Sequence, residues 1–593
     1  MVNGPEGLLL DLDADGWETT DWRMAEEQVR RLRSRIFKAV QDKDWPKVRN
    51  LQKLMLRSRA NTLVSVRQVT QRNAGRKTAG IDGEVALTSC DRAEMAMRVH
   101  ASIRTWQPRA VRRVHIPKAG NRAKLRPLGI PVMVDRCHQA RVRHALEPEW
   151  EARFEPRSYG FRPGRSCQDA IQAIFQATCQ KNAKRVWVLD ADLAAAFDRI
   201  DHSRLLEALG SFPAREMIRA WLKAGVFEAD KGFSPTEEGT PQGGVISPLL
   251  LNVALHGLEE AAGIRYRTDG NHAGETVAGC PIVVRYADDM IALCHSQEQA
   301  RRVKAQLAEW LEPRGLVFNE DKTTIVHLSE GFDFLGVSIR RYPNGKLLTR
   351  PSASAVRRLK LRLAAEVRAL RGSNAQSVII RLDPIVRGWA AYYRSMVASR
   401  VFTTLDQYVW RLTYKWARHS HPNKPRTWVV DRYFGKFNKF RNDRWVFGDR
   451  DSGAYLPKFA WTNIVRHVLV VGGASPDDPG QAEYWAKRRR KITAPVDRYT
   501  LRLLTRQDAR CPLCGEHLLT ADQPPQSPGQ WERWWLQVVK RAIVADYLMH
   551  HGRPRSPDGD QTRLVHASCH RGHLLRKRKR SSTANQNRPS GLA

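Results

Sequence analysis

Two apolar segments of the chain run directly into aspartates. Residues 184–193 (KRVWVLDADL) are rich in strand-forming side chains and reach Asp192. Residues 280–294 (CPIVVRYADDMIALC) have the pattern of a strand, a tight turn and a strand, with Asp288 and Asp289 at the tip. Acids at the ends of apolar strands lie at the edge of a core, where like charges repel one another unless cations neutralise them. The pattern therefore predicts strands that gather carboxylates at the edge of a core.

Carboxylate oxygens are ligands that Mg²⁺ prefers, and two Mg²⁺ ions roughly 3.5–4 Å apart commonly support nucleotidyl transfer. In that chemistry one ion activates a primer 3′-hydroxyl and the other stabilises the leaving pyrophosphate. Asp192, Asp288 and Asp289 are the predicted ligands. An isolated Asp-Asp pair is more often a solvated turn, so this prediction depends on the motifs around it.

The charge balance indicates a polyanionic partner. The 593 residues include 99 Lys and Arg against 61 Asp and Glu, which gives a net charge of +38. A nucleic acid is the simplest partner for such an excess, because each neutralised phosphate releases a condensed counterion. A merely solubilising basic surface is the alternative. Binding to a membrane surface is disfavoured because the basic residues are spread along the chain.

The sequence also bears on location. It contains no run of about 18 uninterrupted apolar residues, which argues against a membrane span. Residues 1–17 lack a basic leader followed by a long apolar segment, so no secretory signal is predicted. We therefore expect a cytoplasmic protein, associated with the nucleoid when bound to RNA.

Helical periodicity is strongest in four regions. From Trp22 to about Gln71, apolar residues recur at three- and four-residue steps among Arg and Lys, which predicts basic amphipathic helices. Similar patterns predict helices at residues 353–371 and 375–398 and around residues 405–418. The acidic residues 1–20 are expected to be loose.

Several motifs occur in the order found in reverse transcriptases. Tyr286–Asp289 resembles the Tyr-x-Asp-Asp box of that family, and Asp192 is followed five residues later by Phe197, as in the family's upstream carboxylate box. The motifs that follow are residues 239–252 (GTPQGGVISPLLLN), 315–328 (GLVFNEDKTTIVHL) and 332–339 (FDFLGVSI). The resemblance covers about residues 70–340 and implies a right-hand polymerase with α/β fingers and palm and a helical thumb.

The resemblance also implies roles for side chains around the metal site. Arg112, Lys118 and Arg126 flank a basic turn between two predicted strands and would bind the triphosphate of the incoming deoxynucleotide. Their positive charge agrees with that role. Phe197 would stack under the sugar and exclude a 2′-hydroxyl, although a buried core phenylalanine is the alternative. The other residues implied to line the substrate site are Gln242, Gly243, Tyr286 and Lys322.

Two later segments narrow the type of reverse transcriptase. Residues 382–394 (LDPIVRGWAAYYR) and 412–434 (LTYKWARHSHPNKPRTWVVDRYF) resemble the maturase region of group II intron proteins. We expect this region to be helical and basic, with exposed Trp and Tyr that could stack on bases. The resemblance implies a group II intron RNA as partner, with splicing assistance and insertion into target DNA as functions.

Cysteine and histidine gather near the C-terminal end of the sequence. Cys511 and Cys514 form a Cys-x-x-Cys pair, and His566 and Cys569 follow in LVHASCHRGH. This spacing predicts a structural Zn²⁺ site with these four ligands, and a disulfide is disfavoured in a cytosolic chain.

The same region resembles the His-Asn-His endonuclease domain of group II intron proteins. By that resemblance His551 would be the general base, while His550 and His570 would hold a nuclease metal, a further Mg²⁺. The chain departs from the pattern because no Asn lies between His551 and His566 and the spacer after the Cys-x-x-Cys pair is long and Trp-rich. A zinc-stapled module that binds DNA without cutting it is the alternative.

Together these features predict an α/β multidomain right-hand polymerase with a zinc-stabilised ββα-metal module. The predicted function is RNA-directed DNA synthesis for intron mobility, with deoxynucleotides, target DNA and intron RNA as partners. The alternatives are a splicing cofactor with an idle polymerase site, a host-adopted enzyme without an intron, and RNA-directed RNA synthesis. The predicted domains are residues 1–70 (basic helical extension), 71–345 (fingers and palm), 346–435 (thumb), 436–505 (basic DNA-binding region), 506–575 (zinc and endonuclease module) and 576–593 (basic tail).

Overall fold

A computed structural model of the chain divides into two compact units. The first comprises Met1–Phe332, Arg340–Leu347 and Val468–Trp485, and the second comprises Asp333–Ile339, Leu348–His467 and Ala486–Ala593. The structure describes residues 12–102, 105–118, 121–268, 274–438, 440–491, 494–515, 517–519, 524–541, 543–547, 562–567 and 569–574.

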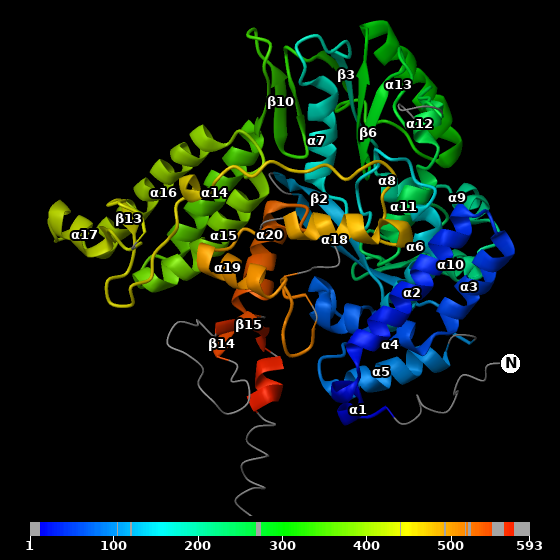
Figure 1. The fold of residues 1–593 in the computed structure, drawn as a ribbon, viewed down its shortest axis with the longest axis horizontal. Coiled ribbons are helices and arrows are strands. Elements are labelled where there is room, and N and C mark those ends of the chain that lie inside the picture. The colour runs from blue at the N-terminus through cyan, green and yellow to red at the C-terminus, as the bar shows by residue number, and fades with distance from the viewer. Residues whose placement is uncertain are drawn as a thin grey trace, which may run out of the picture. The chain divides into compact units, whose positions relative to one another are not determined.

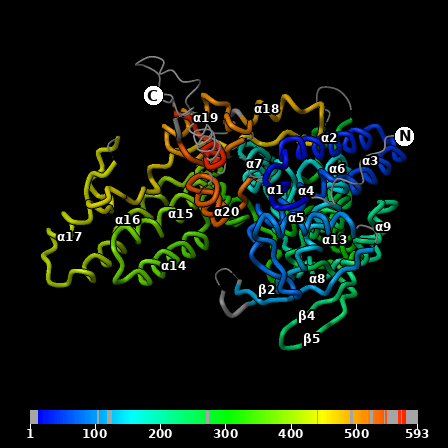
Figure 2. Tube along the Cα trace, turned by 90° about the horizontal axis from the view of Figure 1, so that it is seen from below, coloured from blue at the N-terminus to red at the C-terminus, as the bar shows by residue number. Residues whose placement is uncertain are grey.

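The first unit begins with a group of helices that lie side by side (Figure 2). The side chains of Asp13, Asp21 and Asp44 each accept a hydrogen bond from a backbone N–H in the first turn of the helix that follows. The helices predicted between Trp22 and Gln71 are confirmed. Their bounds, with those of the neighbouring helices, are α1 Ala14–Thr19, α2 Trp22–Gln41, α3 Trp45–Arg57, α4 Arg59–Arg67, η1 Gln68–Arg72, η2 Ala74–Lys77, α5 Ser89–Ala101, α6 Met133–Glu151 and α7 Cys167–Thr178.

The expectation that residues 1–20 are loose is wrong for α1. Trp17 is 2% exposed and packs in a core cluster with Val66 and Val99. One large buried side chain is enough to fix a short helix whose other residues are polar.

A four-stranded sheet of order β2-β1-β4-β5 follows in the first unit. Strands β1 (Val111–Lys118) and β2 (Asn121–Ile130) are antiparallel, which confirms the predicted strand–turn–strand. β4 (Val226–Glu228) pairs in parallel with β1, and β5 (Gly232–Ser234) pairs with β4. Figure 2 shows the β4–β5 hairpin projecting from this unit.

The central sheet of the first unit has the strand order β6-β7-β3-β8. Its strands are β3 Trp187–Asp192, β6 Ile282–Tyr286, β7 Asp289–Cys294 and β8 Thr324–His327. The predicted strand and the predicted hairpin are therefore confirmed. Helix α13 (Gln297–Leu311) packs on β3 and β7, and α7 packs on β6 (Figure 1). The remaining helices of this unit are α8 Ala196–Arg199, α9 His202–Leu209, α10 Arg215–Leu222, α11 Ser247–Ala254, α12 Leu258–Ala261 and η4 Glu312–Arg314.

A short stretch late in the sequence returns to the first unit. Within Val468–Trp485, which we call the return segment, Ser475 and Asp477 are buried. Arg165 donates hydrogen bonds to the carbonyl oxygens of Gly472 (2.7 Å) and Ala474 (3.3 Å). Sequence patterns here predict little more than a Gly- and Pro-containing break, whereas the structure packs this segment into a core.

The second unit contains three long helices, α14 (Ala353–Ala369), α15 (Ala375–Tyr393) and α16 (Ser399–Ser420), which Figures 1 and 2 show lying beside one another. The three predicted helices are confirmed, although α15 ends five residues earlier than predicted and α16 begins earlier. The expectation of exposed aromatic residues is wrong for α15. Trp389 and Tyr393 are 4% and 2% exposed, because neighbouring elements cover the helix on most sides.

The second unit also holds shorter elements and the C-terminal strands. No helix among the described residues is long and apolar enough to cross a lipid bilayer. The bounds are β9 Phe332–Phe334, β10 Val337–Arg341 and β11 Leu347–Pro351 where the chain passes between the units, then α17 Arg426–Tyr433, β12 Phe434–Gly435, β13 Val446–Phe447, η5 Phe459–Trp461, α19 Arg498–Arg506, α20 Pro528–Trp534, η7 Trp535–Lys540, β14 Ile543–Tyr547 and β15 Thr562–His566. Between η5 and α19, η6 (Pro479–Gln481) belongs to the first unit, and α18 (Ala482–Lys491) begins in the first unit and ends in the second.

Candidate active site and metal centres

The three predicted carboxylates converge at one end of the central sheet. Asp192 is the last residue of β3 and lies directly opposite Asp289, the first residue of β7. Asp288 occupies the two-residue turn between the paired residues Tyr286 and Asp289. Strand pairing therefore places three aspartates from separate parts of the sequence next to one another.

The electrostatics of this cluster favour a cation. Burial raises the pKa of Asp289, and the charges of Asp288 and Asp192 raise it further, to about 7. Burial also raises the pKa of Asp288, and the charge of Asp192 adds to this, while the charges of Arg126 and Lys322 lower it. Adjacent carboxylates that repel one another in this way are stabilised when divalent cations replace the bound protons.

The donor set of the cluster fits Mg²⁺. Asp192, Asp288 and Asp289 offer hard oxygen donors from two strand ends and one turn, which is the ligand chemistry that Mg²⁺ prefers. The repulsion that raises the pKa of Asp289 is the kind that a divalent cation relieves. The identity and number of the ions remain proposals.

Two polar side chains after α13 contact Asp192. Lys322 forms an ion pair with the Asp192 carboxylate. Asn319 donates its Nδ2 to Asp192 Oδ2 at 3.4 Å and its backbone N–H to the Asp192 carbonyl at 2.8 Å. The structure therefore brings the predicted residue Lys322 to the cluster. It adds Asn319, which sequence analysis missed although it lies in the same motif.

A set of buried groups supports the turn that carries Asp288. Ala287 has a φ of +59°, and a Cβ at Gly160 would lie 2.3 Å from its backbone nitrogen, so glycine is needed there. Arg285, which is 3% exposed, donates to Asn252 Oδ1 at 2.9 Å and to the Ala287 carbonyl at 3.4 Å. Asn252 in turn donates to the Gly160 carbonyl at 2.9 Å. We call Gly160, Asn252 and Arg285 the turn support.

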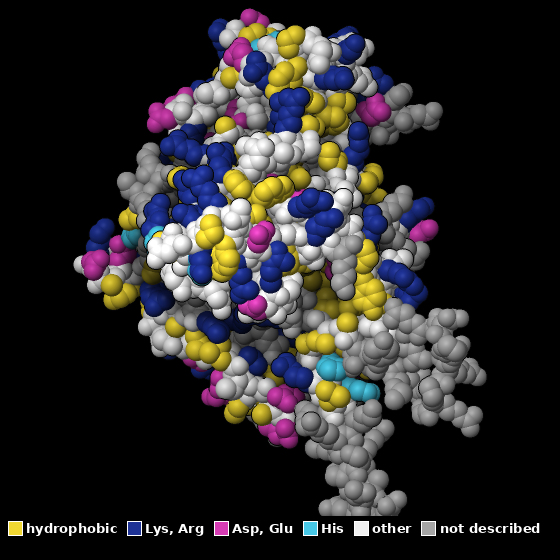
Figure 3. All heavy atoms as spheres, turned by 90° about the vertical axis from the view of Figure 1, so that its left-hand side faces the viewer, with side chains coloured by type: hydrophobic (Ala, Val, Ile, Leu, Met, Phe, Trp, Pro, Cys, Tyr) yellow, Lys and Arg dark blue, Asp and Glu magenta, His cyan; other side chains and the backbone are white. Residues whose placement is uncertain are grey.

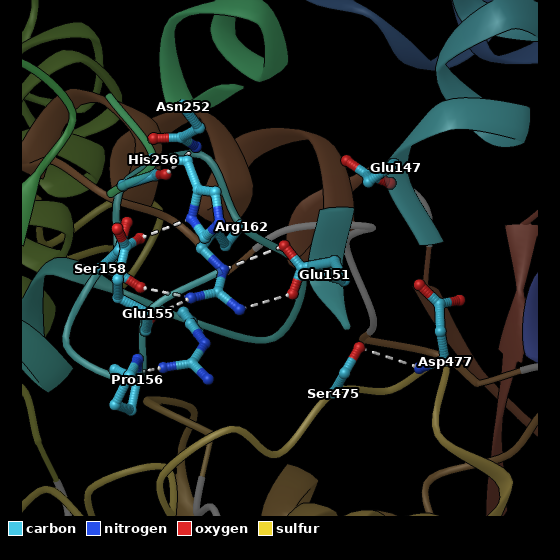
Figure 4. A network of polar contacts seen from close by, with 12 residues as sticks. Glu147, Glu151, Glu155, Pro156, Ser158, Arg162, Asn252, His256, Ser475 and Asp477 are labelled. Carbon is cyan, nitrogen blue, oxygen red and sulfur yellow. Dashed lines mark hydrogen bonds and ion pairs between the residues drawn. The ribbon is translucent and has the colours of Figure 1, made fainter. Parts of the chain in front are cut away.

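The loop that carries Gly160 is itself fixed by a buried ion pair. Arg162 donates to both carboxylate oxygens of Glu151 at 3.0 Å, and both side chains are 1% exposed (Figure 4). The same guanidinium donates to the carbonyls of Glu155 and Ser158. The sequence of this loop, SYGFRPGRS, gives no signal for its role, because the contacts of Gly160 with Asn252 and of Arg165 with Gly472 are to distant parts of the chain.

Phe197 lies in a row of aromatic rings beside the cluster. It is half-buried at the start of α8, where Ala195 adopts a left-handed conformation. Its ring is 6.3 Å from that of Phe161, which is 6.5 Å from that of Tyr286. Phe161 therefore connects the two predicted substrate-site aromatics and is a further residue that sequence analysis missed.

Gln242 and Gly243, which are predicted to line the substrate site, pack closely against β2. A Cβ at Gly243 would lie 2.4 Å from the Gly129 carbonyl oxygen, and the Gly129 N–H donates to the Gln242 carbonyl at 2.6 Å. The Gln242 side chain donates to Asp198 at 3.4 Å. The absence of a side chain at Gly243 therefore permits this close approach of the two backbones.

The three basic residues predicted to bind a triphosphate differ in their position relative to the carboxylate cluster. Strand pairing sets Arg126 of β2 opposite Ile116 of β1. Because side chains alternate between the two faces along a strand, Arg112 lies on the same face as Ile116 and Arg126. Arg112 is four residues from Ile116, roughly 13 Å along the ribbon at 3.3 Å per residue. Arg126 is the one whose charge acts on Asp288. The backbone of Lys118 pairs with Asn121, and its side chain lies outside the described residues.

Basic side chains are widespread on the surface. In Figure 3, which views the side that carries α17 in Figure 1, Lys and Arg are spread over the face while Asp and Glu are sparse. In the second unit the exposed basic residues include Arg357, Arg358 and Arg368 on α14 and Arg411 and Lys415 on α16.

The predicted zinc ligands also converge. One donor atom from each of Cys511, Cys514, His566 and Cys569 lies within 4.8 Å of the others. His566 Nδ1 is 3.4 Å from Cys514 Sγ and 3.9 Å from Cys569 Sγ, while its Nε2 donates to the His517 carbonyl. A hydrogen bond from Cys514 lowers the pKa of Cys511 to about 3 against the effect of burial, and one from His566 adds to this.

Three thiols and one imidazole within this range are the donor set of a structural Zn²⁺ site. The hydrogen bond at His566 Nε2 also leaves Nδ1 free of a proton and directed at the sulfur atoms. We call the four residues the Cys/His cluster. Of the predicted nuclease residues, His570 is in a helical stretch after β15, whereas His550 and His551 lie outside the described residues.

Known families match most of the chain outside its C-terminal region. A model of the reverse transcriptase (RNA-dependent DNA polymerase) family matches residues 116–339. The N-terminal domain of reverse transcriptase matches residues 17–99, and the group II intron maturase-specific domain matches residues 356–434.

Known proteins resemble the same region. The protein YkfC of Escherichia coli K12 is 34% identical over 49% of this chain and 83% of its own. The group II intron-encoded protein LtrA of Lactococcus lactis is 31% identical over 46% of this chain. The chain spans 54% of the length of LtrA.

More distant matches were also found. Maturase-like protein 1 of Euglena gracilis is 26% identical over 63% of this chain and 76% of its own. A solved telomerase structure from Candida albicans matches 55% of this chain and 61% of its own at 13% identity, with a TM-score of 0.31.

The agreement of three family models in consecutive order with these relatives settles the family. The chain belongs to the group II intron reverse transcriptase/maturase family and is an RNA-directed DNA polymerase of that family.

Proposed function

We propose that the protein copies RNA into DNA at the carboxylate cluster of the central sheet with two Mg²⁺ ions. The observation that carries this proposal is the direct pairing of Asp192 with Asp289 beside the turn residue Asp288. When bound, the ions would activate the primer 3′-hydroxyl and stabilise the leaving pyrophosphate.

The chain's own side chains have separate tasks in this proposal. Asp192, Asp288 and Asp289 hold the metals, and Arg126 and Lys322 balance the charge of the triphosphate. Phe197, supported by the ring of Phe161, lies under the sugar and excludes a 2′-hydroxyl. Arg112 and Lys118 extend the basic face toward the phosphates, Gln242 and Gly243 form the floor, and Tyr286 lines the site.

The decisive experiment is primer extension on an RNA template. Asp288→Ala should abolish synthesis, whereas Asp321→Ala, an exposed aspartate outside the cluster, should leave it unchanged. Unchanged synthesis by Asp288→Ala would remove the site assignment. A wild-type protein that assists splicing but extends no primer would favour the idle splicing cofactor instead.

The second part of the proposal is that helices α14 to α16 bind the RNA of a group II intron and assist its splicing. The maturase-specific match over residues 356–434 supports this, together with the exposed Arg357, Arg358 and Arg368 on α14. Sequencing RNA that copurifies with the protein tests it, and enrichment of no intron RNA would favour a host-adopted enzyme. The predicted domain boundaries remain predictions.

The third part concerns the C-terminal module, which we propose to hold Zn²⁺ at the Cys/His cluster and to cut the second strand of target DNA. The order of β14, antiparallel β15 and a following helical stretch at residues 569–574 supports a ββα-metal module. In this proposal His551 is the general base, and His550 and His570 hold a further Mg²⁺. The cut strand would prime synthesis during insertion of the intron RNA.

Nicking of target DNA with Mg²⁺ present separates this proposal from a purely structural module. Wild type should cut and His551→Ala should lose at least about a hundredfold in rate, as expected on removal of a general base. Equal cutting by both proteins, or none by either, would leave a zinc-stapled DNA-binding module as the remaining function.

A further inference from the structure

A tryptophan-rich segment separates the two halves of the Cys/His cluster. Between Cys514 and β14 lie α20 and η7, and we call residues 527–540 the tryptophan insertion. The four cluster ligands lie outside it, so neither metal binding nor the ββα order accounts for its presence. Its contacts therefore need a separate explanation.

The insertion packs on α15 with backbone contact. A Cβ added at Gly388 of α15 would lie 2.6 Å from the backbone nitrogen of Glu532 and 2.9 Å from the carbonyl oxygen of Pro528. Both distances are shorter than side chains tolerate, so the fit depends on the absence of a side chain at Gly388. Contact this close requires the two helices to keep a fixed position.

Asp383, five residues before Gly388 on α15, joins the two elements through its carboxylate. Its side chain is 7% exposed, and Oδ2 accepts from Trp535 Nε1 at 3.2 Å and pairs with Lys540 at 3.1 Å. Oδ1 accepts from Arg387 Nε at 2.6 Å, and the Arg387 guanidinium lies 4.4 Å from the centre of the Trp535 ring. A buried carboxylate shared in this way would be costly if the insertion left.

A third contact fixes the insertion to α14. Arg362 donates to both carboxylate oxygens of Glu532, at 2.7 and 2.8 Å. A bidentate pair of this kind fixes orientation as well as position. On its other side the insertion touches the metal module, because Trp534 Nε1 donates to the carbonyl of Leu519 and η7 leads directly into β14.

We propose that the tryptophan insertion is a docking element that holds the C-terminal metal module on α14 and α15. The module then works as a fixed part of the helical RNA-binding unit and not as a tethered domain. The contacts of Gly388, Asp383 and Arg362 support the docking. Its effect on DNA cleavage rests on the proposed roles of these helices in RNA binding and of the module in cutting DNA. Arg362, Asp383 and Glu532 are positioning residues in this scheme.

The pair of Arg362 and Glu532 allows a charge-reversal test in the full-length protein. Arg362→Glu and Glu532→Arg each bring like charges together and should speed hydrogen exchange of residues 527–547 about fivefold, the scale of one ion pair. The double variant restores an opposite-charge pair and should return exchange to within about twofold of wild type. Singles that match wild type, or a double variant that is not rescued, would overturn the docking role.

Arg432 and Asp451 provide a control pair in the same unit. This pair joins α17 to the turn after β13, and its side chains are 37% and 71% exposed against 44% and 17% for Arg362 and Glu532. The groups that act on the charge of Arg432 are Asp451, Tyr433 and Asp449. Arg432→Glu should leave exchange of residues 527–547 unchanged. An equal effect of this variant would show that any disturbance of the unit loosens the segment, which contradicts specific docking.

The functional readout uses the same proteins. Glu532→Arg, which lies outside the helices proposed to bind RNA, should keep bound zinc and primer extension at wild-type levels but lose about tenfold in target-DNA cleavage, since misplacement alone can cost that much. The double variant should recover cleavage. Loss of zinc or of primer extension in Glu532→Arg would contradict a positioning role. If wild type cuts no DNA, the proposed endonuclease fails while the exchange data still decide docking.

Discussion

At the scale of single residues, the carboxylate cluster makes metal affinity depend on protons. Burial and the charges of Asp288 and Asp192 raise the pKa of Asp289 to about 7, and a metal ligand must be deprotonated. Apparent Mg²⁺ affinity should therefore rise as pH increases through about 7 and then level off. Calorimetric titration with Mg²⁺ at several pH values, in buffers of different ionisation enthalpy, would measure the affinity and the protons released.

The sign of the accompanying stability change is fixed by the same pKa. Without metal, the folded protein holds a proton on Asp289 that the unfolded chain has already lost, so stability from this group falls as pH rises from about 4 to about 7. Mg²⁺ should then stabilise the protein most at the upper end of this range. A Mg²⁺ affinity that does not change with pH would contradict the coupling.

Residues with a local signal could be predicted, and those that depend on distant contacts could not. Asp192 and Asp289 end apolar strands, a pattern visible in the sequence, and strand pairing brings them together. Phe161 and Asn319 gain their importance from rings and carboxylates more than 30 residues away in the sequence. The resemblance to the maturase region predicts an exposed Trp389, whereas its position beneath neighbouring elements is a tertiary property.

At the scale of elements, the turn support predicts a phenotype for a residue that touches neither metal nor substrate. Asn252→Ala removes an acceptor from Arg285 and a donor from the Gly160 carbonyl, which leaves buried polar groups unsatisfied at about 1–3 kcal/mol. The turn that presents Asp288 should then be less well positioned. Primer extension should need several-fold more Mg²⁺ for half-maximal rate, with a rate loss of about tenfold at saturation.

The control for this prediction is Asn182→Ala, which changes an exposed asparagine before β3. It should leave the Mg²⁺ requirement and the melting temperature unchanged. A variant Asn252→Ala that melts earlier but keeps the wild-type Mg²⁺ requirement would show that Asn252 stabilises the fold without positioning the turn.

Element boundaries follow from sequence where capping and periodicity agree. Helix α14 is predicted almost to its ends because Ser352 caps it and apolar residues recur along one face. Helix α8 could not be predicted, since it has four residues and begins after Ala195 in a left-handed conformation. That conformation depends on the motif around Thr240, whose N–H bonds to the Phe197 carbonyl.

At the scale of the whole molecule, the chain leaves the first unit after Leu347 and comes back to it at Val468. Residues 348–467 are therefore covalently anchored to that unit at both ends. Local composition around GGASPDDPG suggests a linker, and its burial depends on partners such as Arg165 and Asp169, about 300 residues earlier. Sequence patterns carry no signal for a contact at that separation.

One arginine of α2 binds the return segment through its guanidinium. Arg33 donates to both oxygens of Asp477, at 2.8 and 2.6 Å, and to Glu147 at 2.8 Å, and its side chain is 12% exposed. Figure 4 shows Glu147 and Asp477 and the hydrogen bond of the Asp477 N–H to Ser475. Burial alone would lower the pKa of Arg33, but the charges of Asp477 and Glu147 raise it above its ordinary value.

Removing this arginine should release the return segment. Arg33→Ala leaves the buried Asp477 carboxylate without this cation and leaves Glu147 with its second partner Arg143, and breaking a buried pair in this way typically costs about 3–5 kcal/mol. Arg31→Ala, on the same helix, removes an exposed pair with Glu27 and should cost less than about 1 kcal/mol. Hydrogen exchange of residues 468–485 and of α2 should rise strongly in Arg33→Ala and remain at wild-type rates in Arg31→Ala. Asp477→Asn removes one of the buried charges that Arg33 had neutralised. Combining it with Arg33→Ala should therefore recover part of the lost protection against hydrogen exchange. A double variant whose residues 468–485 exchange as fast as in Arg33→Ala would refute charge burial as the cause.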